Sequence, residues 1–259
     1  MSDRPELSII IPAYNEEKRL PRTLTRIQDY LSSKNIALDT VEIIIVDDGS
    51  KDATIAVAQE WSRRLPVRVV SNGRNHGKGF SVRHGMLEAR GRIALFTDAD
   101  LSSPIQECTK LLVALASGND VAIGSRAVDR SLIEQHQSPY REIAGMIFNA
   151  FVRLFTLLPF HDTQCGFKAF LLDRSRAVFE QQRIEGFGFD PEILFIAKRH
   201  GLRMSEVPVR WAHDPATKVH IIRDSFVMFC DLLYIRWNWL LGRYPLHARC
   251  DEKRIPQQS

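Results

Sequence analysis

The sequence contains few cysteines, no long apolar run and no large excess of charge of either sign. Its four cysteines form no CxxC pair and no zinc-binding spacing, so we expect neither a disulfide framework nor a structural zinc site. No run reaches the roughly 18 uninterrupted apolar residues of a membrane-spanning helix, so any membrane association should be peripheral. The formal net charge of +4 on 259 residues is too small for a protein that coats nucleic acid.

The first residues lack the features of a secretion signal. Charged residues stand immediately before a short apolar run that ends at Pro12, which is typical of a first strand and not of a signal peptide. The scarce, widely spaced cysteines make a reducing compartment the expected one. We therefore predict a cytoplasmic protein that is not exported.

Apolar β-branched runs alternate with segments of helical periodicity along the chain. This order predicts an α/β fold of the Rossmann-like kind, with a mostly parallel sheet and helices on both faces. The length suits one domain, which we place at residues 1–220, followed by a C-terminal helical appendage at residues 221–259. The four clearest strands are expected at Leu7–Ile11, Val41–Val46, Val67–Val70 and Ile93–Thr97.

Weaker signals mark further elements. Val121–Gly124 has the composition of a fifth strand, and Lys168–Leu172 is a candidate for another. Ser103, Pro104 and Gln106 have the pattern of a helix start, with Ser103 at the N-cap and Gln106 closing a capping box. A helix is therefore predicted between the fourth and fifth strands.

Two segments, Met146–Phe160 and Phe226–Leu241, are unusually apolar for surface helices. Each could be a core helix packed on the sheet or an amphipathic helix in a membrane interface, and core packing is the simpler interpretation for either alone. For the C-terminal segment, aromatic and basic neighbours favour a membrane surface, although a solvated basic tail has the same composition. These neighbours are Arg236, Trp237, Trp239, Arg243, Tyr244, His247, Arg249, Lys253 and Arg254.

Acidic residues follow the strands at the edge where a parallel sheet binds ligands. Asp98 and Asp100 come directly after the fourth strand, and Asp47 and Asp48 after the second. A nucleotide diphosphate beside these carboxylates would be repelled unless a divalent cation lay between them. We therefore predict that Asp98 and Asp100 hold Mg²⁺ or Mn²⁺, which would bridge the phosphates and neutralise the leaving group. A polar turn at the end of the strand is the alternative interpretation.

Two further positions suit a nucleotide. Asp48 could accept a hydrogen bond from a nucleobase or a ribose hydroxyl, or could belong only to a turn that caps the next helix. Lys78 lies in the segment His76-Gly77-Lys78-Gly79, where the third connection should open a helix. Its ammonium group and nearby backbone N–H groups could face a phosphate, although the spacing excludes a P-loop.

Five short motifs occur in an order that resembles a known family, the inverting GT-A glycosyltransferases of family 2, over roughly residues 5 to 220. DTQCGFK at residues 162–168 and FDPE at residues 189–192 are similar to the dolichyl-phosphate β-glucosyltransferase branch, which is related to dolichyl-phosphate mannose synthase. The five motifs are Pro12-Ala13-Tyr14-Asn15-Glu16-Glu17, Asp47-Asp48-Gly49-Ser50, Gly77-Lys78-Gly79, Asp98-Ala99-Asp100-Leu101 and Gly124-Ser125-Arg126.

The resemblance implies a donor site for a nucleotide sugar. The segment Asp98-Ala99-Asp100 would bind the metal and the diphosphate. In the mannose synthase relatives a glutamine two residues past the second aspartate completes the metal shell, whereas this chain has Ser102, so water would fill that position. The implied donor is UDP-glucose, and GDP-mannose is the alternative. The nucleoside would be bound by Pro12, Ala13, Tyr14, Glu16 and Asp48.

The resemblance also implies an acceptor site at a membrane surface. Arg126, Arg141 and Lys168 match basic positions near phosphate, and Lys218 resembles the lysine of a gating loop. The implied acceptor is polyprenyl or dolichyl phosphate at the cytoplasmic face of the membrane. Two alternatives are a polysaccharide or soluble acceptor and a catalytically idle nucleotide-binding module. The intact acidic and basic positions argue against an idle module.

The type of acceptor decides whether the reaction needs a general base. A lipid phosphate is already an anion at neutral pH, since its second pKa is about 6, whereas a hydroxyl would need a positioned carboxylate. With a phosphate acceptor, neither Asp162 nor Asp190 would be an obligatory base, and hydrogen bonding in loops or helix caps is an equally open role for both. Back-side attack would invert the anomeric centre and give a β-linked product from an α-linked donor.

Overall fold

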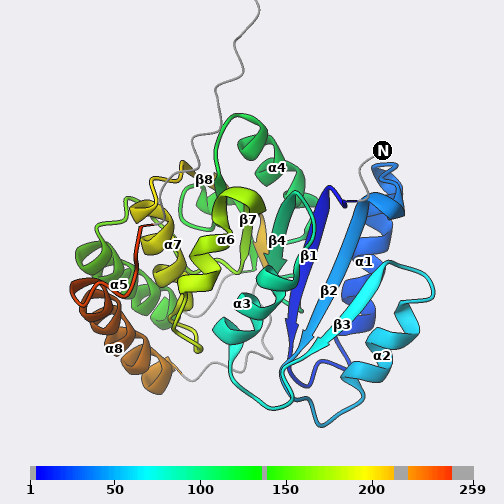
Figure 1. Cartoon of the computed structure of the whole chain (residues 1–259), viewed down its shortest axis with the longest axis horizontal. Coiled ribbons are helices and arrows are strands. Elements are labelled where there is room, and N and C mark those ends of the chain that lie inside the picture. The colour runs from blue at the N-terminus through cyan, green and yellow to red at the C-terminus, as the bar shows by residue number, and fades with distance from the viewer. Residues whose placement is uncertain (1–3, 136–138, 213–220, 247–259) are drawn as a thin grey trace, which may run out of the picture.

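The computed structural model describes residues 4–135, 139–212 and 221–246, which form an α/β fold (Figure 1). The central sheet contains β1 (Leu7–Ala13), β2 (Val41–Asp47), β3 (Val67–Ser71), β4 (Ile93–Thr97), β5 (Val121–Ser125), β7 (Phe167–Leu171) and β8 (Met204–Pro208). Their order across the sheet is β3-β2-β1-β4-β7-β5-β8. Strand β7 is antiparallel to its neighbours β4 and β5, and the remaining pairs are parallel.

Helices cover both faces of this sheet because successive side chains of a buried strand point to opposite sides. Ile9 and Ile11 of β1 belong to the core formed with α1, α2 and α4, whereas Ile10 belongs to the core formed with α3, α6 and α7. The bounds of these helices are α1 (Leu20–Ser33), α2 (Thr54–Trp61), α3 (Lys78–Glu88), α4 (Cys108–Ala116), α6 (Leu172–Gln181) and α7 (Phe189–Arg199).

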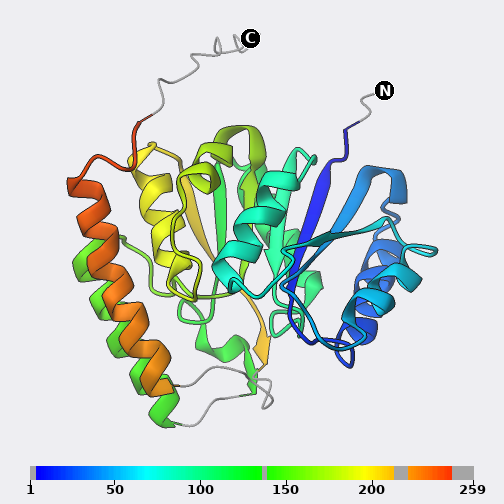
Figure 2. The ribbon, with the colours of Figure 1, turned by 60° about the horizontal axis from the view of Figure 1, so that its bottom comes forward.

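Two long helices, α5 (Pro139–Thr156) and α8 (Ile221–Leu240), lie side by side at one end of the molecule and pack against α7 (Figure 2). The ring of Phe229 meets Phe151 and Phe155 edge-on, with centroids 5.4 and 5.7 Å apart. Each helix buries one side against the core and leaves large apolar side chains exposed on the other. No helix in the described part of the chain is both long and apolar enough to cross a membrane.

The six strands predicted from the sequence are all present, and the helix expected after the third strand begins at Lys78. Strand β8 and the small parallel pair of β6 (Ile133–Gln135) and β9 (Trp211–Ala212) were not predicted. Strand β8 has polar residues and ends in proline, so its apolar signal is weak. The predicted domain boundary at residue 220 lies outside the described residues.

The predicted capping box at residues 103–106 is wrong. Pro104 itself precedes a short 3₁₀ turn, Ile105–Glu107, in an extended conformation with ψ of 140°, and no side chain caps that turn. The hydroxyl of Ser103 instead lies 3.6 Å from the Cys165 sulfur, beside the segment that precedes β7. Ser103 therefore contacts Cys165, which is distant in sequence, and does not cap the helix end that the local pattern predicted.

The two apolar segments begin earlier than predicted, and neither is solely a core helix. In α5, Phe148 and Val152 are buried, but Met146, Ile147 and Leu154 are each more than half exposed. Helix α8 has the same two sides. Leu232 and Ile235 are buried, and the exposed apolar residues are Phe226, Val227, Leu233, Trp237 and Leu240. The core interpretation favoured for α5 thus describes only half of its surface.

Candidate active site

Two loops at the carboxyl ends of β1 and β2 are tied together by hydrogen bonds. The Asn15 N–H donates to Ser50 Oγ at 2.9 Å, and the Asn15 side-chain oxygen accepts from the Lys51 N–H at 2.8 Å. The Glu16 N–H donates to Thr54 Oγ1 at 2.8 Å. These bonds hold the segment with Pro12, Ala13, Tyr14 and Glu16, for which we predicted nucleoside binding, against the Asp47-Asp48-Gly49-Ser50 turn.

Asp48 is buried and fixes the loop that leads into α3. Its carboxylate accepts from the Asn72 side chain at 2.8 Å and from the backbone N–H groups of His76 and Gly77 at 3.0 and 2.8 Å. The neighbouring Asp47 carboxylate accepts from the N–H groups of its own turn. Both aspartates therefore have a structural task, and the predicted contact of Asp48 with the nucleoside remains a prediction.

The predicted metal ligands, which follow β4, lie beside a half-buried lysine, Lys78. The Lys78 ammonium, in the first turn of α3, pairs with Asp98 Oδ1 at 2.5 Å. Burial lowers the pKa of Lys78, but the carboxylates of Asp98 and Asp190 outweigh it and raise the pKa above its usual value. Asp100 Oδ1 accepts from the Ser102 N–H at 2.8 Å. Burial first, and then the charge of Asp98, raise the pKa of Asp100.

Asp98 and Asp100 fit a divalent cation that is shared with a bound diphosphate. Two carboxylates with the same charge disfavour each other's ionised form, as the raised pKa of Asp100 indicates, and a cation would relieve that repulsion. No group of three or more potential protein ligands is found among the residues that the structure describes. Magnesium is commonly bound in proteins by one or two carboxylates, with substrate phosphates and water completing the shell.

Gly166 lets the segment before β7 pass directly over Asp98. A Cβ atom at this position would lie 2.2 Å from Asp98 Oδ2, which is far inside van der Waals contact. The carboxylate is paired with Lys78, so moving it away from a new methyl group would strain that ion pair. The glycine in DTQCGFK therefore leaves the space that the carboxylate of a predicted metal ligand occupies.

Lys168 is completely buried and does not face a groove. Its ammonium forms an ion pair with Asp190 at the start of α7 and donates to the Cys165 carbonyl at 2.6 Å. It also lies over the ring of Phe96, 5.3 Å from the ring centroid. Burial raises the pKa of Asp190, although the charges of Lys168 and Lys78 oppose that shift. The geometry gives Lys168 a structural partner where we predicted a phosphate contact.

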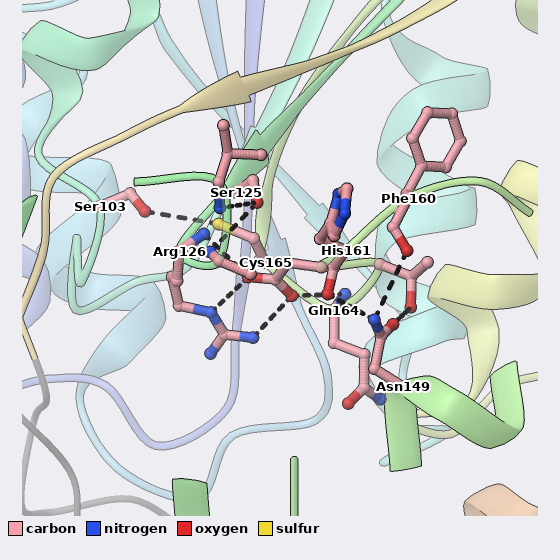
Figure 3. Close-up of polar contacts among 12 residues, drawn as sticks. Ser103, Ser125, Arg126, Asn149, Phe160, His161, Gln164 and Cys165 are labelled. Carbon is pink, nitrogen blue, oxygen red and sulfur yellow. Dashed lines mark hydrogen bonds and ion pairs between the residues drawn. The ribbon is translucent and has the colours of Figure 1, made fainter. Parts of the chain in front are cut away.

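Arg126, at the end of β5, is held by Asp162. Its Nε and Nη2 atoms donate to the two carboxylate oxygens at 2.6 and 2.9 Å, and its backbone N–H donates to the same carboxylate at 3.0 Å (Figure 3). Burial alone raises the pKa of Asp162, but the Arg126 guanidinium lowers it to about 2. Burial lowers the pKa of Arg126, but the Asp162 carboxylate outweighs this effect and raises the pKa, and Asp98 adds a smaller contribution in the same direction.

The loop that carries Asp162 is anchored from two sides. Glu206 of β8 accepts from the backbone N–H groups of His161 and Asp162 at 3.0 and 2.8 Å. Asn149 of α5 donates to the His161 carbonyl and accepts from the Thr163 hydroxyl at 3.3 Å (Figure 3). This anchoring joins the apolar helix α5 to the position of Arg126.

A cavity of about 130 Å³ opens beside Arg126. Two guanidinium groups, a histidine and two side-chain amides line it, and an indole ring forms part of its wall. The lining residues that matter here are Arg126, Arg130, Asn149, His161, Gln164 and Trp211. Of these, the sequence analysis named Arg126, and Gln164 lies within the DTQCGFK motif. His161, Asn149 and Trp211 belong to no motif that we recognised, so burial and pairing in three dimensions were needed to find them.

Two predicted residues are not placed. Arg141 lies in the first turn of α5, but its side chain is not among those that the structure describes. Lys218 lies outside the described residues. Their predicted contacts with the acceptor and the gating role remain predictions.

Comparison with known proteins shows the family of this chain. Residues 8–176 match the family described as Glycosyl transferase family 2. The chain is 39% identical to a dolichyl-phosphate beta-glucosyltransferase of Drosophila melanogaster, over 94% of this chain and 79% of that protein. It is 34% identical to the human protein of the same name, over 95% of this chain and 79% of that protein.

Solved structures share the fold at lower identity. Mannosyl-3-phosphoglycerate synthase from Rubrobacter xylanophilus superposes with a TM-score of 0.64 at 19% identity, over 96% of this chain and 79% of that chain. Glucosyl-3-phosphoglycerate synthase from Mycobacterium tuberculosis, in complex with UDP, gives a TM-score of 0.62 at 21% identity, over 95% of this chain and 82% of that chain. The GT-A fold is thereby confirmed. The chain belongs to glycosyl transferase family 2, in the branch that contains the dolichyl-phosphate beta-glucosyltransferases.

Proposed function

We propose that this glycosyltransferase moves glucose from UDP-glucose onto the phosphate of a polyprenyl or dolichyl phosphate at the cytoplasmic face of a membrane, with inversion. The observation that carries the proposal is that one helix lines both the cavity beside Arg126 and an apolar groove. Gly145, Met146 and Asn149 of α5 line the cavity beside Arg126. Ile143 and Ile147 of α5 line the groove.

The groove suits the chain of a lipid acceptor. It has a volume of about 430 Å³ and lies between the N-terminal halves of α5 and α8, where Phe148, Phe226 and Phe229 form its walls. An amphiphile with an anionic head and an apolar tail needs both surfaces at once, whereas a soluble glycan would leave the apolar one exposed to water. The names of the similar dolichyl-phosphate beta-glucosyltransferases support the same choice.

The donor would lie at the carboxyl ends of β1, β2 and β4. The loop with Tyr14 and the buried Asp48 would hold the uridine, and Asp98 with Asp100 would hold the cation. A bound Mg²⁺ or Mn²⁺ would neutralise the negative charge that develops on the diphosphate as it leaves. Solved relatives in complex with Mn²⁺ and UDP-glucose, and with Mn²⁺ and GDP-mannose, support a divalent metal and leave its identity to experiment.

The acceptor phosphate would attack without a strong general base. Its oxygen is already anionic, so the chain has to bring two anions together and orient them. Arg126 is suited to this because a guanidinium binds phosphate through parallel N–H bonds, while Asp162 holds the group in place from the opposite edge. Bond formation to the anomeric carbon and departure of UDP on the opposite side would give a β-linked glucosyl phosphate.

Asp162→Asn should leave measurable transfer and raise the KM for polyprenyl phosphate by roughly tenfold to a hundredfold, the range of one or two charge-assisted hydrogen bonds. The reason is that the amide keeps the shape of the side chain but no longer pairs with the charge of Arg126. Because the pKa of Asp162 is held at about 2, its titration should not appear in the pH profile of the enzyme. Complete loss of chemistry with unchanged acceptor binding would instead identify Asp162 as a base.

Gly166→Ala should lower kcat/KM by roughly a hundredfold, since a displacement of about 1 Å at a reacting centre has effects of that size. The new methyl group would push Asp98 from its position, because the Cβ would lie 2.2 Å from Oδ2. Steady-state kinetics at saturating Mn²⁺ measures the effect. Gly186→Ala is the matched control, because a Cβ there meets nothing within 4 Å. Equal activity of the two variants would contradict the placement of Asp98.

Replacing exposed apolar residues of α8 should weaken binding to anionic vesicles. Phe226 and Trp237 are 68% and 58% exposed, so Phe226→Ser and Trp237→Ser should not disturb the core. Each should reduce the partition coefficient by roughly tenfold, since burying such a side chain contributes about 1.5–3 kcal/mol. Vesicle co-sedimentation measures this, with Val113→Ser on α4 as the control at 60% exposure. Undiminished binding of both α8 variants would remove α8 from the membrane contact.

The experiment that tests the proposed function crosses donors with acceptors. Radiolabelled UDP-glucose and GDP-mannose are each incubated with polyprenyl phosphate and with soluble glycans, in the presence of Mg²⁺ or Mn²⁺. We expect label in the lipid fraction only with UDP-glucose and polyprenyl phosphate. Transfer to a soluble glycan, or from GDP-mannose alone, would overturn the assignment of acceptor or donor.

A further inference from the structure

The guanidinium of Arg126 is held on a second side by an aromatic ring. Its Cζ atom lies over the indole of Trp211, 5.3 Å from the ring centroid. Asp162 takes the edge that carries Nε and Nη2. Nη1 has no hydrogen-bond partner within residues 4–135, 139–212 and 221–246. One face and one edge of the group are therefore occupied, and an edge remains for a ligand.

Trp211 belongs to a strand that connects the donor side with the acceptor side. In the pairing of β9 with β6, Trp211 lies opposite Ile133. Trp211 and Ile133 both line the cavity beside Arg126. The next residue, Ala212, donates its N–H to the Ser102 carbonyl at 2.8 Å, two positions past Asp100. On the other side, the Val209 N–H donates to the Ser125 carbonyl at 3.1 Å, next to Arg126. The indole is thus fixed between the loop of the predicted metal ligands and the acceptor cavity.

An aromatic face has a specific effect on a guanidinium. It attracts the cation and covers its face, while the N–H groups in the plane stay available for hydrogen bonds. Without the ring, Asp162 would be the remaining side-chain partner of Arg126 among the described residues, and the guanidinium could follow that carboxylate away from the cavity. An aliphatic residue fills space but supplies no such attraction.

Resting on the function proposed above, we propose that Trp211 is the positioning residue for the acceptor: it holds Arg126 so that the remaining guanidinium edge meets the acceptor phosphate. The residue would not contact the donor. Its loss should therefore act on the acceptor alone, and another aromatic ring should replace it.

The test compares Trp211→Leu with Trp211→Phe. For Trp211→Leu we expect the KM for polyprenyl phosphate to rise about tenfold, with the affinity for UDP-glucose and Mn²⁺, measured by calorimetry, within about twofold of the original. Trp211→Phe should restore most of the acceptor KM. The matched control is Trp61→Leu at the end of α2. It removes a similar contact, in which Arg64 Cζ lies 5.5 Å from the centroid of the Trp61 ring.

Direct binding of farnesyl phosphate to the full chain separates this inference from the proposed function. Weaker binding by Trp211→Leu and restored binding by Trp211→Phe would support the role of Trp211. If the unaltered chain nevertheless transfers no sugar to polyprenyl phosphate, the proposed function alone is refuted. Acceptor binding unchanged in Trp211→Leu, or donor affinity lost to the same extent as acceptor affinity, would overturn the inference. Equal losses in the phenylalanine and leucine variants would also overturn it.

Discussion

Asp98→Asn and Asp100→Asn should each lower kcat by about a thousandfold or more, which corresponds to roughly 4 kcal/mol of transition-state stabilisation. Each substitution removes one of the two carboxylates that would hold the cation at the diphosphate. Both residues follow the carboxyl end of β4 and are partly exposed, so the fold should remain intact. In Asp100→Asn the repulsion from Asp98 disappears, and the metal-free protein should be at least as stable as the original.

Kinetics at saturating donor, together with thermal unfolding, measures both effects. Asp29→Asn is a suitable control, because Asp29 is an exposed aspartate on α1. Addition of EDTA to the unaltered chain should abolish transfer, and Mn²⁺ should restore it. Full turnover by Asp100→Asn, or transfer that persists in EDTA, would exclude these carboxylates as metal ligands.

Lys168→Met should destabilise the fold by roughly 3–5 kcal/mol, because it leaves the Asp190 carboxylate buried without its cation. Burial already raises the pKa of Asp190, and loss of Lys168 would raise it further. The destabilisation should then be larger at pH 8 than at pH 5, since only the ionised carboxylate is penalised. Urea unfolding at the two pH values measures the difference.

The double variant Lys168→Met/Asp190→Leu provides the control, since replacing a whole buried pair with apolar residues is often neutral. It should recover most of the lost stability. A single variant as stable as the original would contradict the burial of the ion pair. So would a double variant that is no more stable than the single one.

The strands of the sheet were predictable because their apolar β-branched runs are continuous. The mostly parallel arrangement was also predictable, but the antiparallel position of β7 was not. Strand β7 was predicted as a strand, but nothing local indicates that it lies antiparallel between β4 and β5. That position also explains Lys168: once β7 is central in the sheet, a side chain on it that points to the α7 side has no access to solvent. The sequence motif therefore suggested that Lys168 contacts phosphate, because the motif does not show that Lys168 pairs with Asp190.

The site was predictable where functional side chains directly follow the end of a strand, as Asp98 and Asp100 follow β4. It was not predictable where a role depends on residues distant in sequence. Asn149 illustrates this: in the sequence it only interrupts an apolar segment, whereas in the structure it joins α5 to the loop of Asp162. The exposed sides of α5 and α8 likewise became visible only when the packing on α7 defined which sides were covered.

The most direct test of the central claim is the anomeric configuration of the product. The full chain is incubated with UDP-glucose, polyprenyl phosphate and Mn²⁺, and the anomeric proton of the glycolipid is observed by NMR. Attack by the acceptor phosphate on the face opposite UDP predicts a β-linked glucosyl phosphate. An α-linked product, or the absence of a sugar-phosphate linkage in the lipid fraction, would contradict the account.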